Sequence, residues 1–274
     1  MKVRDVDLNV SVSGEGFPLI WGHGLMASMV AEDGTGWFQW ERMNECAKLI
    51  RYDARGHGKS GASYAPGDYR WKNLAGDMVA ILDESGSDTY IAGGQSMGCA
   101  TSIYAALATP DRTKALLLVN PPTAWETRAD QASLYGKMAL AARLLGGRTL
   151  ARLVNTQPER LIPAWMVADM GDEVNSIGES IKTINGKTLA TILRGAALCD
   201  LPPREELEYL VIPTLILAWE GDRSHPVETA EELADLMPES QLHVARDIYD
   251  FKTWPLLMRE FVRSVVEMPG DDEG

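Results

Sequence analysis

The segment Gly93-Gly94-Gln95-Ser96-Met97-Gly98 combines residue types and a spacing that could carry out nucleophilic chemistry. It lies between an apolar run, Thr89–Ala92, and a run of small residues, Cys99–Ala106. A strand that ends at glycines, a G-x-S-x-G turn and an immediate helix form a nucleophile elbow, which holds a serine on a strained turn with its hydroxyl exposed. The glycines suit this turn because strand and helix backbones pass close together there, and a Cβ would clash. We therefore predict Ser96 to be a nucleophile.

A serine hydroxyl becomes a good nucleophile only when a base within hydrogen-bond reach takes its proton and a carboxylate orients that base. The four histidines of the chain are the candidates for this base: His23, His57, His225 and His243. A glycine-rich loop before a helix, without chemistry, is the alternative interpretation of the Ser96 segment. The elements around it decide between the two.

Apolar runs that alternate with helical patterns predict the elements that position Ser96. Strands are expected at Val3–Val12 (half-buried), Phe17–Trp21, Lys48–Tyr52, Thr89–Ala92, Ala115–Val119, Pro213–Trp219 and Gln241–Ala245. Helices are expected at 37–47, 73–82, directly after Ser96, at 229–237 with a capping box at Thr229–Glu232, and from Pro255 to Val266. Continuous apolar strands alternating with helices predict an α/β fold, with a mainly parallel central sheet covered by helices on both faces.

The alternation stops at Pro121-Pro122, and only helical patterns follow from Trp125 to about Asp200, with breaks at Gly146, Gly147, Pro158, Pro163, Gly171 and Gly186. These could be further helices of a single core. We favour a helical cap over residues 122–203, inserted after the sixth strand, because Pro202-Pro203 marks a clear return to the α/β pattern. Residues 1–121 and 204–274 would then form the core.

Composition limits the class of protein. The 274 residues can form one large domain or a core with an inserted subdomain. No apolar run is long enough for a membrane span and no signal peptide is evident, so we expect a cytoplasmic protein. A formal net charge of -13 argues against nucleic acids and anionic membranes as partners. The three cysteines have neither disulfide nor zinc spacing, so no metal is expected, and the acidic tail 268–274 is expected to fray.

With these motifs in order, the chain resembles the α/β-hydrolase family over nearly its whole length, in the manner of serine esterases and carbon–carbon hydrolases with a helical cap. The residues that carry the resemblance each follow a predicted strand: Gly22-His23-Gly24-Leu25, Asp53-Ala54-Arg55-Gly56-His57-Gly58-Lys59-Ser60, Gly94-Gln95-Ser96-Met97-Gly98, and Gly221-Asp222 with Pro226. The resemblance implies an α/β-hydrolase fold and a nucleophile at Ser96.

The resemblance also implies an oxyanion hole, formed by the backbone N–H groups of Met97 and Leu25. It implies a substrate site at His23, Gly24, Leu25 and Met97, with no cofactor. His23 would shape its loop, and His57 would have a structural role in its turn.

The family's chain order is serine, acid, histidine, and Asp222 matches the acid. The histidine is expected after the last strand, but that loop reads Ile248-Tyr249-Asp250-Phe251. We therefore hypothesise an exchanged arrangement, in which His225 is the base and Asp250, at or next to the usual histidine position, is its carboxylate partner. Asp222 would be a second carboxylate near the ring or the orienting one. The alternative is that His225 only decorates a turn, and we expect His243, inside a strand, to be structural or surface-exposed.

The leading functional hypothesis is a serine carboxylesterase that forms an acyl-enzyme on a small neutral ester or lactone. Cleavage of a carbon–carbon bond in a diketone or ring-cleavage product is a second possibility, and cofactor-free peroxidation or perhydrolysis a third. A small-molecule-binding protein that has lost the chemistry belongs to a different class, and a homodimer is left open. The fold alone does not choose among them.

Overall fold

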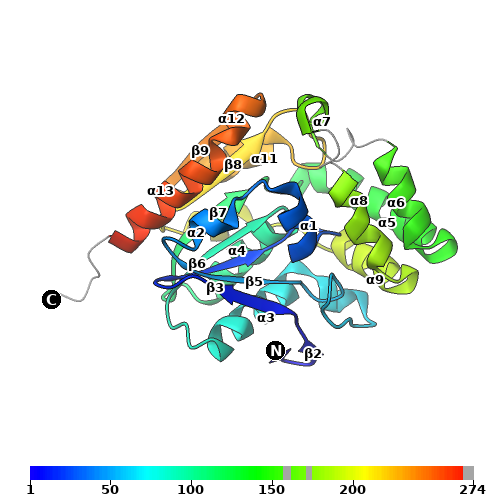
Figure 1. Cartoon of the computed structure of the whole chain (residues 1–274), viewed down its shortest axis with the longest axis horizontal. Helices are drawn as coiled ribbons and strands as arrows, with labels where there is room; N and C mark the ends of the chain where they lie inside the picture. Colours follow the sequence, from blue (N-terminus) through cyan, green and yellow to red (C-terminus); the bar gives the residue numbers. More distant parts are fainter. Residues whose placement is uncertain (157–161, 171–174, 268–274) are drawn as a thin grey trace.

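The computed structural model describes residues 1–156, 162–170 and 175–267, and within them a seven-stranded sheet carries helices on both faces (Figure 1). The sheet order is β3-β5-β4-β6-β7-β8-β9, and every pair is parallel except β3 with β5. A short hairpin, β1-β2, precedes it. The strands are β1 Lys2–Val3, β2 Val6–Asp7, β3 Val10–Ser13, β4 Pro18–Gly22, β5 Lys48–Tyr52, β6 Tyr90–Gln95, β7 Thr113–Val119, β8 Thr214–Trp219 and β9 Ser240–Ala245. The predicted fold class is confirmed.

The helices fall into two sets, those that alternate with the strands and those that lie between β7 and β8. The first set is α1 Met29–Thr35, α2 Trp40–Met43, α3 Trp71–Glu84, α4 Met97–Ala108, α11 Val227–Leu236, α12 Ile248–Lys252 and α13 Trp254–Glu267. The second is α5 Arg128–Leu145, α6 Gly147–Asn155, α7 Ala164–Met170, α8 Asn175–Thr183, α9 Gly186–Ala197 and α10 Arg204–Leu207. Two short 3-10 helices, η1 Pro66–Tyr69 and η2 Trp125–Thr127, complete the described chain.

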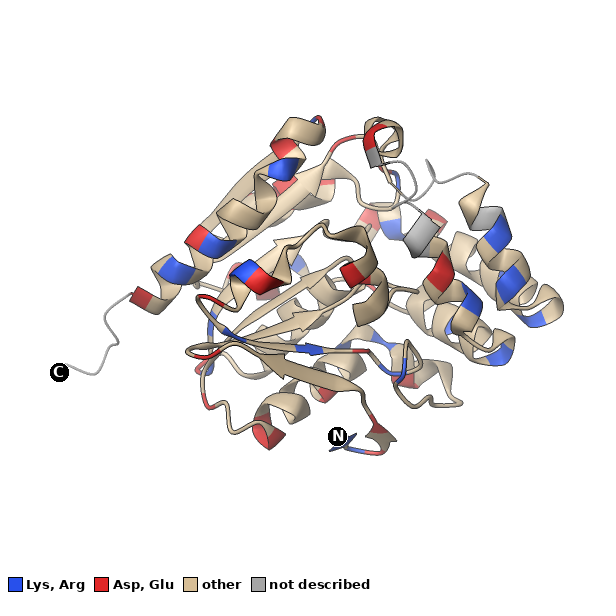
Figure 2. Ribbon diagram, in the orientation of Figure 1, with Lys and Arg blue, Asp and Glu red and all other residues tan. Residues whose placement is uncertain are grey.

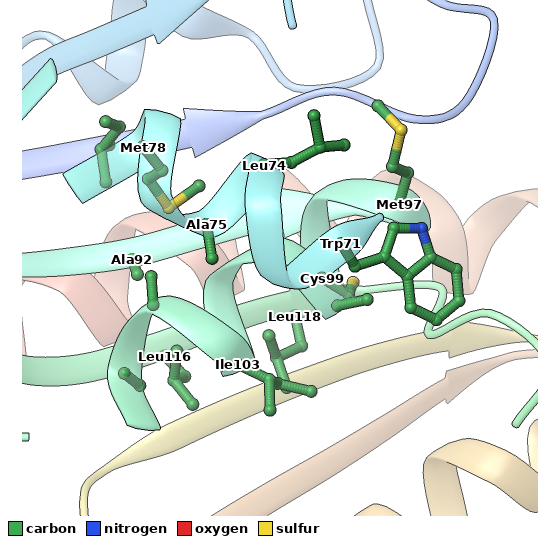
Figure 3. Packing of buried hydrophobic residues seen from close by; sticks show 14 of the residues in the cluster. Trp71, Leu74, Ala75, Met78, Ala92, Met97, Cys99, Ile103, Leu116 and Leu118 are labelled. Carbon is green, nitrogen blue, oxygen red and sulfur yellow. The ribbon is translucent and has the colours of Figure 1, made fainter. Parts of the chain in front are cut away.

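Burial of both sheet faces explains the continuous apolar strands. Along β7, Leu116 and Leu118 belong to the cluster under α3 and α4, whereas Leu117 belongs to the cluster on the opposite face. Figure 3 shows the first cluster, in which Trp71 and Met78 of α3 pack towards α4 and the sheet. A fully buried leucine contributes roughly 1.5–3 kcal/mol. Consistent with this double burial, β4, β6 and β8 carry no charged residue (Figure 2).

Three sequence predictions differ from the structure. The predicted strand Val3–Val12 is divided into β1, β2 and β3, because Arg4 turns with a left-handed φ of 53°. The predicted helix at 37–47 is reduced to α2, and α1 before it was not predicted. The capping box was also wrong, since α11 begins at Val227 after Pro226 and Thr229 lies buried in its first turn.

The helices between β7 and β8 share an apolar cluster of their own. It includes Ala139 and Ala142 of α5, Leu189 and Leu193 of α9, and Met26, which comes from the loop after β4. Gly147 and Gly186 start α6 and α9, while Pro158 and Gly171 lie outside the described residues. The division into a core and a cap at 122–203 stays a prediction. The acidic tail at 268–274 also lies outside the described residues.

None of the helices in the described ranges has both the length and the apolar character needed to cross a membrane.

Candidate active site

Ser96 occupies the turn between β6 and α4, as the elbow motif predicts. Its backbone has φ 54° and ψ −109°, a strained conformation for a residue with a side chain, and its N–H bonds to the Val119 carbonyl at 2.9 Å. The turn closes because three glycines touch: a Cβ on Gly98 would lie 1.9 Å from the Gly22 carbonyl oxygen, and one on Gly94 would lie 2.4 Å from Gly98. The glycines therefore set the position from which the serine hydroxyl projects.

His225 links Ser96 to a carboxylate. Its Nε2 lies 2.8 Å from Ser96 Oγ, and its Nδ1 lies 2.5 Å from Asp222 Oδ2. An ionised carboxylate can only accept hydrogen bonds, so Nδ1 carries the proton that faces Asp222. In the neutral ring Nε2 is then free to accept the hydrogen bond of the serine hydroxyl. This is the geometry in which a histidine can take the serine proton.

Asp222 is held in its ionised form by three donors. Besides His225, the Trp219 indole Nε1 donates to Oδ2 at 3.0 Å and the Ser224 N–H donates to Oδ1 at 2.7 Å. Burial alone would raise the pKa of the Asp222 carboxyl, but the charge of His225 and these hydrogen bonds lower it below its ordinary value. The carboxylate can therefore orient the ring and stabilise its positive charge.

Asp250 does not take part in this arrangement, and the hypothesis that it is the partner of His225 was wrong. Its Oδ2 accepts a hydrogen bond from the Arg246 N–H at 3.0 Å, and the side chain is exposed. The physical reason is that α12 begins directly after β9, with Asp247 as its N-cap. Asp250 is thereby turned towards the backbone of its own loop.

The other three histidines lie in structural surroundings. The His23 ring bonds to the Gly24 carbonyl and accepts from Ala54 N–H, and the His57 ring bonds to the Arg55 carbonyl and accepts from Met26 N–H. Both rings are buried, and burial lowers the pKa of each, to about 3 for His57. They tie the loops after β4 and β5 together. His243 is exposed on β9, a strand at the edge of the sheet.

The two amides expected to form an oxyanion hole are unpaired. Met97 is the first residue of α4, where N–H groups lack intrahelical acceptors. Within the described part of the chain, neither its N–H nor that of Leu25 has a protein acceptor. The Leu25 loop lies against the nucleophile, since a Cβ on Gly24 would be 3.7 Å from Ser96 Cβ. An oxyanion role for these amides stays a prediction.

A cavity of about 120 Å³ opens beside Ser96 and His225. Gly24 and Leu25 line it, as predicted for a substrate site. His23 and Met97 are not among the described residues that line it, because the His23 ring is buried and the Met97 side chain packs in the core near Trp71 (Figure 3). A role for either residue in substrate binding stays a prediction. The described residues that line it are Gly24, Leu25, Met26, Ala27, Ala31, Glu32, Thr35, Trp37, Gln95, Ser96, Ile162, Ile181, Trp219 and His225.

Glu32 is an acidic residue of this lining that was not predicted from the sequence. It belongs to α1, whose start is marked by Ser28, the side chain of which accepts from the Ala31 N–H. An N-cap serine just before a short apolar pattern was the available signal.

Comparison with known proteins adds relatives of the same fold. The profile of the alpha/beta hydrolase fold family matches residues 18–251. RutD of Azorhizobium caulinodans, named as a carbamate hydrolase, is 27% identical over 239 residues, which cover 87% of this chain and 86% of RutD. The 3-oxoadipate enol-lactonase 2 of Acinetobacter baylyi is 24% identical over 256 residues, covering 89% of this chain and 86% of the enzyme.

Solved structures give the same picture of the fold. The enol-lactonase from Burkholderia xenovorans LB400 superposes with a TM-score of 0.81 at 20% identity, over 95% of this chain and 98% of that one. The family profile spans most of the described core and includes Ser96, Asp222 and His225. The chain belongs to the alpha/beta hydrolase fold family.

Proposed function

We propose that this protein is a serine hydrolase that cleaves a small carboxylic ester or lactone through an acyl-enzyme on Ser96. The observation that carries the proposal is the unbroken line of hydrogen bonds from Ser96 Oγ through the His225 ring to Asp222, at 2.8 and 2.5 Å. An acyl-enzyme mechanism requires a base and an orienting carboxylate, and His225 and Asp222 could supply both from one loop. A protein that only binds its ligand has no need for this line.

The reaction follows from the positions of these groups. Ser96 Oγ attacks the substrate carbonyl as His225 Nε2 takes its proton, and Asp222 stabilises the resulting imidazolium. The Leu25 and Met97 amides would hold the oxyanion of the tetrahedral intermediate. His225 then gives the proton to the departing alkoxide, which leaves the acyl group on Ser96. A water molecule, deprotonated by His225, releases the acid and restores the serine.

The cavity and the relatives support a small substrate with a polarised carbonyl. Most lining side chains are apolar, including Leu25, Trp37, Ile162 and Ile181, which suits a compact and largely uncharged molecule. The names of the two relatives, a carbamate hydrolase and an enol-lactonase, denote hydrolysis at a carbonyl bonded to nitrogen or oxygen. Carbon–carbon bond hydrolysis needs the same serine and histidine, but no observation favours it specifically.

Labelling with a fluorophosphonate, followed by mass mapping, tests the proposal. We expect one adduct on Ser96 in the folded protein, none in Ser96→Ala, and labelling slowed by at least about 100-fold in His225→Gln. Folded protein that does not react, or reacts at another residue, would refute an activated Ser96. Turnover of p-nitrophenyl heptanoate by the wild type, absent in Ser96→Ala, would then establish ester hydrolysis.

A further inference from the structure

Glu32 is an acidic residue in the lining of a mostly apolar cavity. The residue is 4% exposed and lies in the same cavity as Ser96 and His225. Of the described residues that line it, Glu32 and His225 are the two that can carry a charge near neutral pH. His225 is accounted for by the proposed proton transfer, whereas Glu32 has no part in it.

The carboxyl group is fixed in place but retains acceptor capacity. Oε1 accepts from the Trp21 indole N–H at 3.0 Å, and Oε2 accepts from Arg51 Nη2 at 3.2 Å. An ionised carboxylate offers about four lone-pair sites, so two remain for another donor. Thr35, which also lines the cavity, donates its hydroxyl to the Glu32 carbonyl at 2.7 Å and therefore does not donate to the carboxylate.

Neutralising Arg51 does not by itself require Glu32. Arg51 Nη1 already bonds to Asp33 Oδ1 at 2.7 Å, its Nη2 donates to the Met29 carbonyl at 3.1 Å, and its guanidinium stacks on Trp40 at 4.5 Å. Burial raises the pKa of Glu32 to about 7 although Arg51 and Trp21 oppose the rise. The carboxylate is thus incompletely compensated, and a further donor or positive charge in the cavity would stabilise it.

We propose that Glu32 forms a polar subsite of the substrate cavity, which takes an ammonium, amide N–H or hydroxyl group of the substrate and disfavours a free carboxylate. This inference rests on the proposed function, because it names the substrate class of the same site. A donor bound to Glu32 gains a charge-assisted hydrogen bond to a buried carboxylate. A carboxylate would instead meet a like charge at close range.

Three p-nitrophenyl esters of matched chain length test the subsite: heptanoate, 6-aminohexanoate and the adipate monoester, whose chains end in a methyl, an ammonium and a carboxylate group. For the wild type we expect kcat/KM for the 6-aminohexanoate ester to exceed that for the adipate monoester by about 10- to 100-fold, the range of a charge-assisted hydrogen bond. In Glu32→Gln, which preserves shape and removes the charge, the ratio should fall to within about 3-fold.

Asp33→Asn is the matched control, because it disturbs Arg51 from the exposed side without touching the cavity. It should keep the wild-type ratio. A second readout does not depend on turnover: hexylammonium should protect Ser96 of the wild type from fluorophosphonate at concentrations about 10-fold below those of hexanoate, and Glu32→Gln should abolish this difference.

The outcomes separate this inference from the proposed function. If the wild type hydrolyses the heptanoate ester but Glu32→Gln alters neither the ester ratio nor the protection, the subsite is refuted while the hydrolase stands. A change in either readout supports the subsite and shows which part of the substrate reaches it. If Glu32→Gln does not fold, the wild type alone still tests the subsite. The subsite is refuted if hexylammonium and hexanoate protect the wild type equally and the two charged esters are turned over equally. Failure of Ser96 to react refutes the proposed function instead.

Discussion

Two buried carboxyl groups lie close to the cavity beside Ser96, and their surroundings push their pKa values in opposite directions. Asp222, in the loop after β8, receives hydrogen bonds from His225, Trp219 and Ser224, and its pKa is lowered. Glu32, on α1, receives two, and burial raises its pKa to about 7. Both are nearly inaccessible to water. The difference shows that the donors aimed at a carboxylate, rather than its depth alone, decide in which direction its pKa moves.

The largest effect should come from removing the charge behind His225. Asp222→Asn offers an amide in place of the carboxylate, so the ring is no longer held with Nδ1 protonated and Nε2 free. We expect kcat/KM for p-nitrophenyl heptanoate to fall by about 10⁴-fold with little change in fold. A variant that keeps more than a tenth of wild-type activity would show that Asp222 is not needed in the proposed mechanism. The contrast between Asp222 and Glu32 would then have no bearing on catalysis.

The next effect is on the pH dependence of the free energy of unfolding, and it comes from Glu32. Its pKa is about 7 in the folded protein against an ordinary glutamate value of 4.5, so the folded state holds the proton more tightly than the unfolded chain. The associated stability is fully present below pH 4.5 and is lost as the pH rises through about 7. Over this window the wild type should lose on the order of 3 kcal/mol more than Glu32→Gln. Urea unfolding at pH 4.5 and 8 measures it, and equal losses would contradict the assignment.

A smaller effect is expected at the outer partner of Arg51. Asp33 is about half exposed, and surface ion pairs contribute roughly 0–1 kcal/mol. Asp33→Asn should therefore lower the free energy of unfolding by less than about 1 kcal/mol at pH 7. Thermal unfolding compared with Glu32→Gln provides the measurement. A loss well above about 1 kcal/mol would mean that the Arg51–Asp33 ion pair is stronger than an exposed pair.

The smallest effect should be at Asp250, the carboxylate at or next to the position where the family has its histidine. Asp250→Asn should change kcat/KM by less than about twofold and the free energy of unfolding by no more than about 0.5 kcal/mol. This variant has the same chemical change as Asp222→Asn, so the pair is a matched test. Comparable losses of activity in both would restore the exchanged arrangement that the structure does not support.

The elbow was predictable because its cause is local. Gly94 and Gly98 flank Ser96 between a strand and a helix, so steric rules that act within a few residues predict the turn, and Ser96 lies where they require. The fold class was predictable for a similar reason. Because β7 and its neighbours are buried on both faces of the sheet, their sequences are continuous apolar runs.

The partners of Ser96 depend on contacts that sequence order does not reveal. His225 was a candidate, but the sequence left open whether Asp250 or Asp222 orients it. The structure selects Asp222 because the Trp219 indole and Ser224 N–H hold that carboxylate beside the ring, and both are contacts within one turn. Glu32 was missed because α1 has only seven residues and no sustained periodicity.

The position of Asp222 and His225 on the same loop has a consequence for engineering. Asp222 and His225 are three residues apart on a single loop, whereas the usual family order separates acid and histidine across the last strand. The proposed base and acid therefore lie on one short loop. Grafting this single loop onto another protein of the same fold could transfer both residues together. The segment after β9 supplies no residue to the proposed mechanism. It should therefore accept insertions or fusion partners that would inactivate a relative whose histidine follows the last strand.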